Sequence, residues 1–129
     1  FAEGGAILPK PLAVNEDLGP DTATPVAING LVFGPSYGLL CLDAADGLKL
    51  RWRNESEQAL TGFCTLIAGN DRVLVFTETG TLYLVAAEGG QCRVLGKMPL
   101  CGKTWSHPAL ADGRLYIRDD KTLYCYDFR

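Results

Sequence analysis

An internal repeat runs through most of this chain. Leu31, Val73 and Leu115 take equivalent places in three similar segments, and their spacings are equal, since 73 − 31 = 42 and 115 − 73 = 42. Self-similarity at a fixed period of this length is typical of repeat architectures. The three segments are INGLVFGPSYGLLCLD at 28–43, GNDRVLVFTETGTLYLVA at 69–86 and ADGRLYIRDDKTLYCYD at 111–127.

Within each segment, two short runs rich in β-branched and aromatic residues are separated by polar turns, as in VLVF and TLYLV. This pattern predicts hairpins. Nowhere does an apolar period of 3.6 persist over the ten or so residues that an amphipathic helix needs. The chain is therefore expected to be all-β. The turn pairs that precede the inner runs are Asn29-Gly30, Asn70-Asp71 and Asp112-Gly113.

Each segment is also flanked by outer runs, which raises the count to four strands in about 42 residues. That is the content of one blade of a β-propeller, whereas a β-sandwich does not impose a fixed repeat of this length. We therefore expect a partial β-propeller of about three four-stranded antiparallel blades, near 24–60, 61–100 and 101–129, with the last blade incomplete. The outer runs are TPVAI, CTLIA and HPALA before the hairpins, and LKLRWR and CRVLGKM after them.

The N-terminal region, residues 1–23, differs from the repeats. GAILPKPLAV at 5–14 is interpreted as an outer strand of a preceding blade, and its two prolines, Pro9 and Pro11, suit only an edge position. Residues 15–22 are acidic and rich in turn residues, so they are expected to form a connecting loop.

The end of the first repeat carries a distinctive motif. Cys41-Leu42-Asp43 closes a strand, Gly47 lies in the next turn, and Trp52 follows on the next run. A small residue fits between packed blades, an aspartate can accept bonds from turn amides, glycine tolerates an unusual backbone, and tryptophan fills space against a neighbour. In the third repeat, Cys125-Tyr126-Asp127 fits the same pattern. We expect Asp43, Gly47, Trp52 and Asp127 to form a structural blade-docking motif.

This motif resembles the propeller repeat of pyrroloquinoline quinone (PQQ) dehydrogenases and their non-enzymatic relatives, in which Ala-x-Asp, a glycine and a tryptophan follow in that order. Two departures stand out: one additional residue separates Gly47 from Trp52, and Ala86 replaces the aspartate in the second repeat. The resemblance covers residues 24–129.

The resemblance implies a non-enzymatic binding scaffold without a cofactor. Because the last repeat has three strands and no fourth, we expect the chain to be the C-terminal part of a larger propeller. Its relatives include a periplasmic lipoprotein that helps to assemble outer-membrane β-barrels, which implies a periplasmic or otherwise extracytoplasmic location. The alternative is a fragment of a quinone-dependent alcohol or sugar dehydrogenase, with PQQ and calcium as cofactors. In such enzymes a vicinal disulfide often covers the quinone, and this chain has no Cys-Cys pair.

Three blades do not close a ring, because propellers have four to eight. We therefore expect either further blades from a longer chain or self-association. The protein partner cannot be named from the sequence. Nucleic acid is not expected, since the net charge is −3 and the twelve basic residues are scattered. No apolar run approaches the roughly 18 to 20 residues that span a bilayer.

The five cysteines lack the CxxC pairs typical of zinc sites, and we interpret them as small buried side chains. Cys41 and Cys125 are expected to be buried on one face of their strands without a disulfide, and Cys92 and Cys101 are the one pair considered for a bridge. His107, beside Ser106, is not expected to form a catalytic pair, because adjacent residues on a strand point to opposite sides. The pairs Asn70-Asp71 and Asp119-Asp120 are interpreted as solvated turns rather than as metal or catalytic sites.

Overall fold

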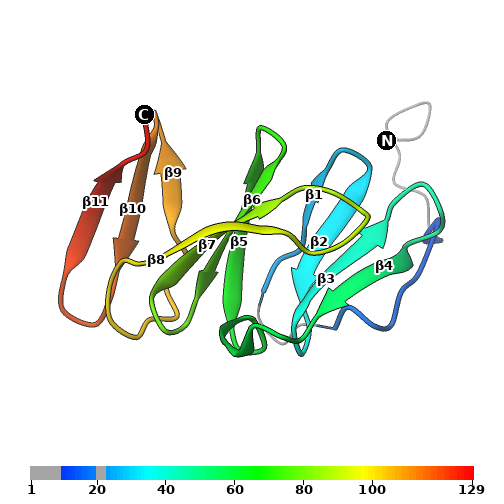
Figure 1. The fold of residues 1–129 in the computed structure, drawn as a ribbon, viewed down its shortest axis with the longest axis horizontal. Coiled ribbons are helices and arrows are strands. Elements are labelled where there is room, and N and C mark those ends of the chain that lie inside the picture. The colour runs from blue at the N-terminus through cyan, green and yellow to red at the C-terminus, as the bar shows by residue number, and fades with distance from the viewer. Residues whose placement is uncertain (1–9, 20–22) are drawn as a thin grey trace.

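The computed structural model describes residues 10–19 and 23–129, and this part of the chain is all-β. Three antiparallel sheets follow one another in sequence, and within each sheet every strand pairs with the next along the chain. Figure 1 shows the three sheets side by side. The first sheet contains β1 (Val26–Ile28), β2 (Leu31–Pro35), β3 (Leu39–Asp43) and β4 (Lys49–Asn54); the second contains β5 (Cys64–Gly69), β6 (Arg72–Thr77), β7 (Thr81–Ala86) and β8 (Val94–Pro99); the third contains β9 (Ala109–Ala111), β10 (Arg114–Arg118) and β11 (Leu123–Asp127).

The first hairpin of each sheet turns through two residues with positive φ. The values are 53° and 74° at Asn29 and Gly30, and 49° and 58° at Asn70 and Asp71. Positive φ at both central positions defines a type I′ turn, whose twist matches that of the flanking strands. Asparagine, aspartate and glycine tolerate this conformation better than other residues, so the polar pairs predicted as turns have a direct backbone reason.

The register corrects one detail of the repeat. Leu31 directly follows its turn, and its structural equivalents are therefore Arg72 and Arg114, which pair with Gly69 and Ala111 across the same tight turns. Val73 and Leu115 stand one residue later. The step from the first sheet to the second is thus 72 − 31 = 41 residues. Only the step from the second sheet to the third has the predicted spacing of 42 residues.

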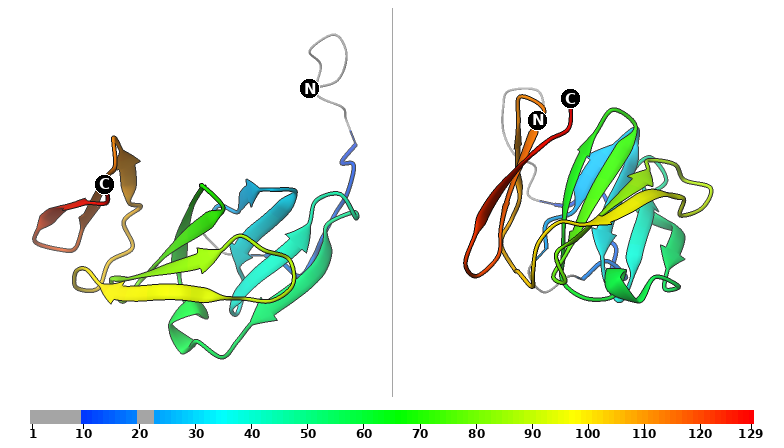
Figure 2. Two further views of the ribbon diagram at one scale, coloured as in Figure 1. Left: turned by 45° about the horizontal axis from the view of Figure 1, so that its top comes forward. Right: turned by 60° about the vertical axis from the view of Figure 1, so that its left-hand side comes forward.

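Side chains from neighbouring sheets form two cores. Phe33, Leu39 and Cys41 of the first sheet pack with Val73 and Val75 of the second in one buried cluster. The opposite face of the second sheet forms the other cluster, in which Phe76 and Leu82 pack with Leu115 and Ile117 of the third sheet. The second sheet is thus covered on both faces, and Figure 2 shows it between the other two.

The third sheet has three strands and one uncovered face. Leu115 and Ile117 point toward the second sheet, so Tyr116 and its cross-strand partner Cys125 point the other way. Cys125 is exposed, whereas Cys41, at the equivalent position of the first sheet, is fully buried. The prediction that Cys125 is buried was therefore wrong, because no sheet formed by residues 10–19 and 23–129 covers this face.

Cys92 and Cys101, the pair considered for a bridge, are both free thiols, as are Cys41, Cys64 and Cys125. Burial raises the pKa of the Cys41 thiol to about 11 and that of Cys64 to about 12. Both groups are therefore protonated at neutral pH and unreactive.

The strand predicted for residues 5–14 is not found where it can be checked. Residues 5–9 lie outside the described residues, and residues 10–14 form no strand. Leu12 and Val14 are largely exposed there, so their side chains do not pack against a sheet of the described residues. Farther along, Asn15 donates a hydrogen bond of 2.9 Å to the carbonyl oxygen of Leu48, and Leu18 lies against Gly34 of the first sheet.

No helix in the described residues is long and apolar enough to cross a membrane.

Candidate functional site

Two places in the fold gather polar side chains with defined partners. The first is the predicted motif at the end of β3. There Asp43 ends the strand, and its Oδ1 accepts hydrogen bonds from the backbone amides of Ala45 and Asp46 at 2.9 and 3.0 Å. The other carboxylate oxygen accepts bonds from the Arg51 guanidinium. The Arg51 bonds, followed by the turn amides, lower the pKa of the Asp43 carboxyl.

A β-bulge lies in the first sheet between Gly47 and Trp52. Leu50 pairs with Leu42 and Trp52 pairs with Cys41, which leaves Arg51 without a cross-strand partner. Its side chain is therefore free to reach Asp43 from the neighbouring strand. Gly47 has a φ of 61° and turns the chain into this strand. Arg51 was not identified from the sequence, because a β-bulge follows from strand pairing and not from the local pattern.

Trp52 lies between the first and second sheets. Its side chain is buried, and its ring centroid is 5.8 Å from that of Phe33. The indole Nε1–H donates a hydrogen bond of 3.0 Å to the backbone carbonyl of Glu88, which follows β7 in the second sheet. This one side chain thus contributes both apolar contact and a directed bond across the junction of the two sheets.

The other repeats vary the same arrangement. Ala86 stands where the first sheet has Asp43, and the carboxylate of the nearby Glu88 instead pairs with Arg93 at 2.8 Å. In the third sheet, Asp127 binds Arg129 through both the backbone amide and the guanidinium. The structure therefore does not bring Asp127 together with Asp43, Gly47 and Trp52: it lies in the same place of a different sheet.

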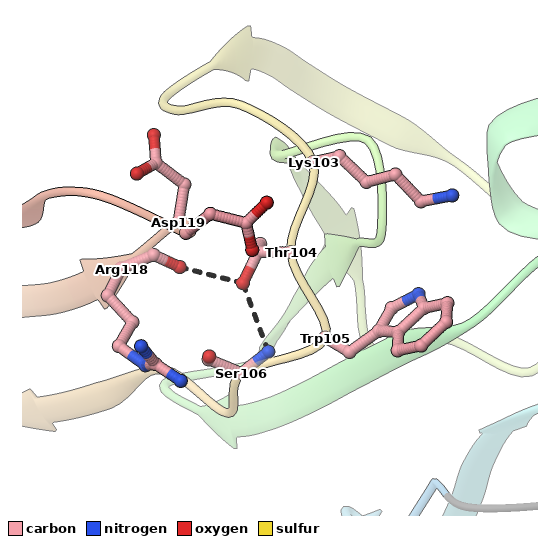
Figure 3. A pocket seen from close by; sticks show the side chains of 7 residues that line it. Lys103, Thr104, Trp105, Ser106, Arg118 and Asp119 are labelled. Carbon is pink, nitrogen blue, oxygen red and sulfur yellow. Dashed lines mark hydrogen bonds between the residues drawn. The ribbon is translucent and has the colours of Figure 1, made fainter.

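The second place is a hollow of about 410 Å³ where the second and third sheets meet. Figure 3 shows Thr104 and Ser106 on the side of the connecting segment that faces Arg118 and Asp119, whereas the side chains of Lys103 and Trp105 point to the opposite side. A volume of this size falls within the range of small-molecule sites. The lining residues are Lys103, Thr104, Trp105, Ser106, Arg118, Asp119 and Asp120.

Thr104 anchors the floor of this hollow to both sheets. Its backbone amide donates to the carbonyl of Glu78 in the second sheet at 2.9 Å, and its hydroxyl donates to the carbonyl of Arg118 in the third sheet at 2.7 Å. The same hydroxyl accepts a bond from the amide of Ser106 at 3.0 Å. Because Thr104 is buried, these bonds are shielded from competing water.

Asp119 fixes the far wall. Its Oδ1 accepts bonds from the amides of Lys121 and Thr122, both at 2.9 Å, and its Oδ2 accepts from the Tyr124 hydroxyl and the Gly102 amide. These bonds, led by the two turn amides, lower the pKa of the Asp119 carboxyl to about 2. Asp119 thus lies in the predicted turn, and its carboxylate stabilises that turn by accepting bonds from the turn amides.

Trp105 is exposed in the connection between β8 and β9, at 67% of its accessible surface. Its Nε1–H donates to Glu78 Oε2 at 2.9 Å, and the Lys103 ammonium lies 5.5 Å from the ring centroid. His107 is also exposed and stands edge-on to the ring of Phe63, with 6.3 Å between centroids. No hydrogen bond joins His107 to Ser106 in this part of the structure.

Comparison with known proteins yields no match, either to a protein-family model or to a curated protein. In the described residues there is also no group of three or more histidine, cysteine, aspartate or glutamate side chains arranged to hold a metal ion. Any function must therefore be argued from the fold and from these two places.

Proposed function

We propose that the chain is part of a β-propeller of the PQQ-like repeat class and that it acts as a non-enzymatic binding scaffold. One observation carries the proposal: consecutive sheets stack through the same register positions. Val73 and Val75 of β6 face the preceding sheet, and so do Leu115 and Ile117 of β10, each 42 residues later. Sheets that repeat one stacking relation are what a propeller is built from.

The proposed docking role of Trp52 is supported by its position between two sheets. The Asp43–Arg51 pair supports the same role, because it fixes the turn and the bulge from which the tryptophan projects. In this proposal, Gly47 provides the backbone conformation of that turn, and Asp127 with Arg129 is the counterpart in the third blade.

A binding role is supported by surfaces that the described chain leaves uncovered. These are the outer face of the third sheet and the free edge of β11, which has no fourth strand beside it. Unpaired strand edges and open sheet faces are sites at which proteins bind other chains. The periplasmic or extracytoplasmic location is part of the proposal and rests on the family resemblance alone.

The enzymatic alternative can be tested directly. The purified chain is incubated with PQQ and calcium ions, separated from free quinone by gel filtration, and examined for quinone absorbance and for oxidation of alcohols and sugars with an artificial electron acceptor. We expect neither bound quinone nor substrate-dependent dye reduction, while a known quinoprotein dehydrogenase serves as positive control. Stoichiometric quinone binding with turnover would replace the scaffold proposal by the dehydrogenase.

A further inference from the structure

The two outermost faces of the row of sheets correspond to the two sides of one repeated junction. Figure 1 shows the first sheet at one end of the row and the third sheet at the other end. Strand pairing gives each residue on these two outer faces an equivalent in a junction that is already formed inside the chain. The chain itself therefore indicates what kind of surface each outer face fits.

The outer face of the first sheet corresponds to the side of a junction that receives a preceding sheet. Its residues point away from the second sheet, because they alternate along β2 and β3 with Phe33 and Cys41, which point toward it. In the second sheet, the equivalent residues are buried against the first sheet. The outer residues of the first sheet are Val32, Gly34, Leu40 and Leu42, and their equivalents by register are Val73, Val75, Tyr83 and Val85.

The outer face of the third sheet corresponds to the opposite side of the same junction. In the first sheet, the side chains at these positions pack directly on the second sheet. The third sheet thus presents an aromatic, a leucine and a cysteine side chain where the first sheet has the same three kinds. The equivalents by register are Tyr116 for Phe33, Leu123 for Leu39 and Cys125 for Cys41.

Leu18 completes the outer face of the first sheet. Gly34 has no side chain where the second sheet has Val75, and Leu18 lies in that space: a Cβ added to Gly34 would be 2.7 Å from Leu18 Cδ1. Leu60 and Leu100 lie in the segments that lead into the second and third sheets, and the preceding sheet buries them to 0% and 6% exposure. Leu18 is only half-buried, so it is placed like a leucine that a further sheet would bury.

The segment that carries Leu18 is held against the first sheet and is acidic. Asn15 Oδ1 accepts hydrogen bonds from the amides of Asp17 and Leu18 at 2.9 and 3.0 Å, and Asn15 Nδ2 donates to the carbonyl oxygen of Leu48. The side chains of Glu16 and Asp17 are exposed beside Leu18. Two carboxylates therefore stand at the edge of this outer face.

The outer face of the third sheet carries the opposite charge. Arg114 and Arg118 lie on either side of Tyr116 along β10, at positions that alternate to the same face, and both are exposed. Packing this face on the first sheet brings arginines toward carboxylates, whereas packing two third sheets on each other would bring arginines together. Charge thus supports the pairing that the repeated junction indicates.

We propose that a second copy of the chain docks the outer face of its third sheet on the outer face of the first sheet, head to tail. The apolar side chains of the third sheet pack around Leu18, and the two arginines approach the two carboxylates. This inference rests on the blade-like stacking of the proposed function and names one partner for both outer faces. Two copies joined in this way supply six sheets, within the four to eight that close a propeller.

Charge reversal tests the arrangement. Arg114→Glu with Arg118→Glu reverses the charge of the third sheet's outer face, and Glu16→Lys with Asp17→Lys reverses that of the first. Sedimentation velocity from about 1 μM to about 1 mM measures association. We expect the natural chain to reach twice its mass of 13.9 kDa. Each double variant alone should associate at least roughly tenfold more weakly, because attractive pairs become repulsive, and an equimolar mixture of the two should regain the natural affinity.

Matched variants separate this effect from changes in net charge and in folding. Lys97→Glu with Lys103→Glu changes the net charge as much as the arginine variant, away from both outer faces, and should associate as the natural chain does. Leu18→Ser should weaken association several-fold, whereas Leu12→Ser, at a position 95% exposed in the same segment, should not. The reversed charges are all exposed, so the variants should fold, which circular dichroism checks.

Three results would overturn the proposal. A natural chain that stays at 13.9 kDa at every concentration would exclude the second copy. Natural association of the Glu16 and Asp17 variant, with none of the Arg114 and Arg118 variant, would assign the contact to two third sheets. A mixture that associates no better than the separate variants would exclude charge pairing between the two faces. The scaffold function is decided separately by quinone binding, so the two failures are distinguishable.

Discussion

At the scale of single residues, Trp52 gives the junction of the first two sheets both apolar contact and a hydrogen bond. We expect Trp52→Ala to lower the free energy of unfolding by about 3–5 kcal/mol, as truncation of a large core residue does. Trp52→Phe keeps most of the packing but loses the bond to Glu88, so the loss should be closer to 1 kcal/mol for that bond. Urea denaturation measures both. A loss below about 1 kcal/mol for the alanine variant would contradict a docking role.

Asp119 is expected to make stability depend on pH. Its folded pKa of about 2 lies below its ordinary value of 3.8, so the unfolded chain takes up a proton first as the pH falls. The stability contributed by this carboxylate is therefore complete above about pH 4 and is lost between about pH 4 and pH 2. Asp119→Asn should be less stable than the natural chain at neutral pH.

The difference between these two proteins should disappear near pH 2, as followed by thermal unfolding at several pH values. Asp120→Asn is the control, because the Asp120 carboxylate accepts no hydrogen bond within the described residues, and it should follow the natural chain throughout. A constant difference between Asp119→Asn and the natural chain across this range would contradict the assignment.

At the scale of elements, the turn between β6 and β7 contacts the segment that leads from β8 to the third sheet. Gly80 has a φ of 78°, and a Cβ placed there would lie 2.3 Å from the carbonyl oxygen of Cys101 and 2.4 Å from that of Gly102. The carbonyl oxygen of Gly80 also accepts a hydrogen bond of 2.9 Å from the backbone amide of Leu100. The turn and the connection are therefore in direct backbone contact.

This contact yields a paired prediction. Gly30→Ala, also at positive φ but with no atom within 4 Å of the added Cβ, should cost about 1 kcal/mol from backbone strain alone. Gly80→Ala carries the same strain and forces backbone carbonyls apart, so it should cost at least about 2 kcal/mol more. Chemical denaturation of the two variants side by side decides this. Equal losses of stability in the two variants would mean that the close approach of backbone carbonyls to Gly80 does not affect the free energy of unfolding.

At the scale of the whole molecule, the outer face of the third sheet is left uncovered by the described residues. Leu123 is 72% exposed and Cys125 is exposed on that face, where the equivalent faces of the other two sheets are covered. Because each sheet stacks on the next in the same way, we expect a second copy of the chain to cover it. Light scattering should then give a mass above the 13.9 kDa of one chain, rising with concentration.

Cys125→Asp should lower that mass, since it places a charge in the centre of the face, while Asp46→Asn, far from it on the first sheet, should leave the mass unchanged. A stable monomer of the natural chain at all concentrations would contradict both the self-association and the view that this face is an incomplete blade surface.

Much of the local structure follows from the sequence. The turn pairs Asn29-Gly30 and Asn70-Asp71 adopt positive φ because few other residues do so without strain, and the alternating runs beside them can bury one side only as strands. Hence the hairpins and most outer strands could be predicted. A strand was also predicted around Pro11, but the described residues 10–14 do not form one. A strand needs a neighbouring strand to pair with, and the local sequence pattern does not show whether one is present.

The tertiary structure decided the rest, because the remaining properties depend on residues distant in the sequence. Arg51 reaches Asp43 only through a bulge set by pairing with β3, and Thr104 becomes an anchor only where two sheets meet. Cys41 and Cys125 occupy equivalent positions in similar strands, yet one is buried and the other exposed. Strand pattern determines to which side a residue points, but burial depends on whether another sheet lies on that side, and only the three-dimensional stacking decides this.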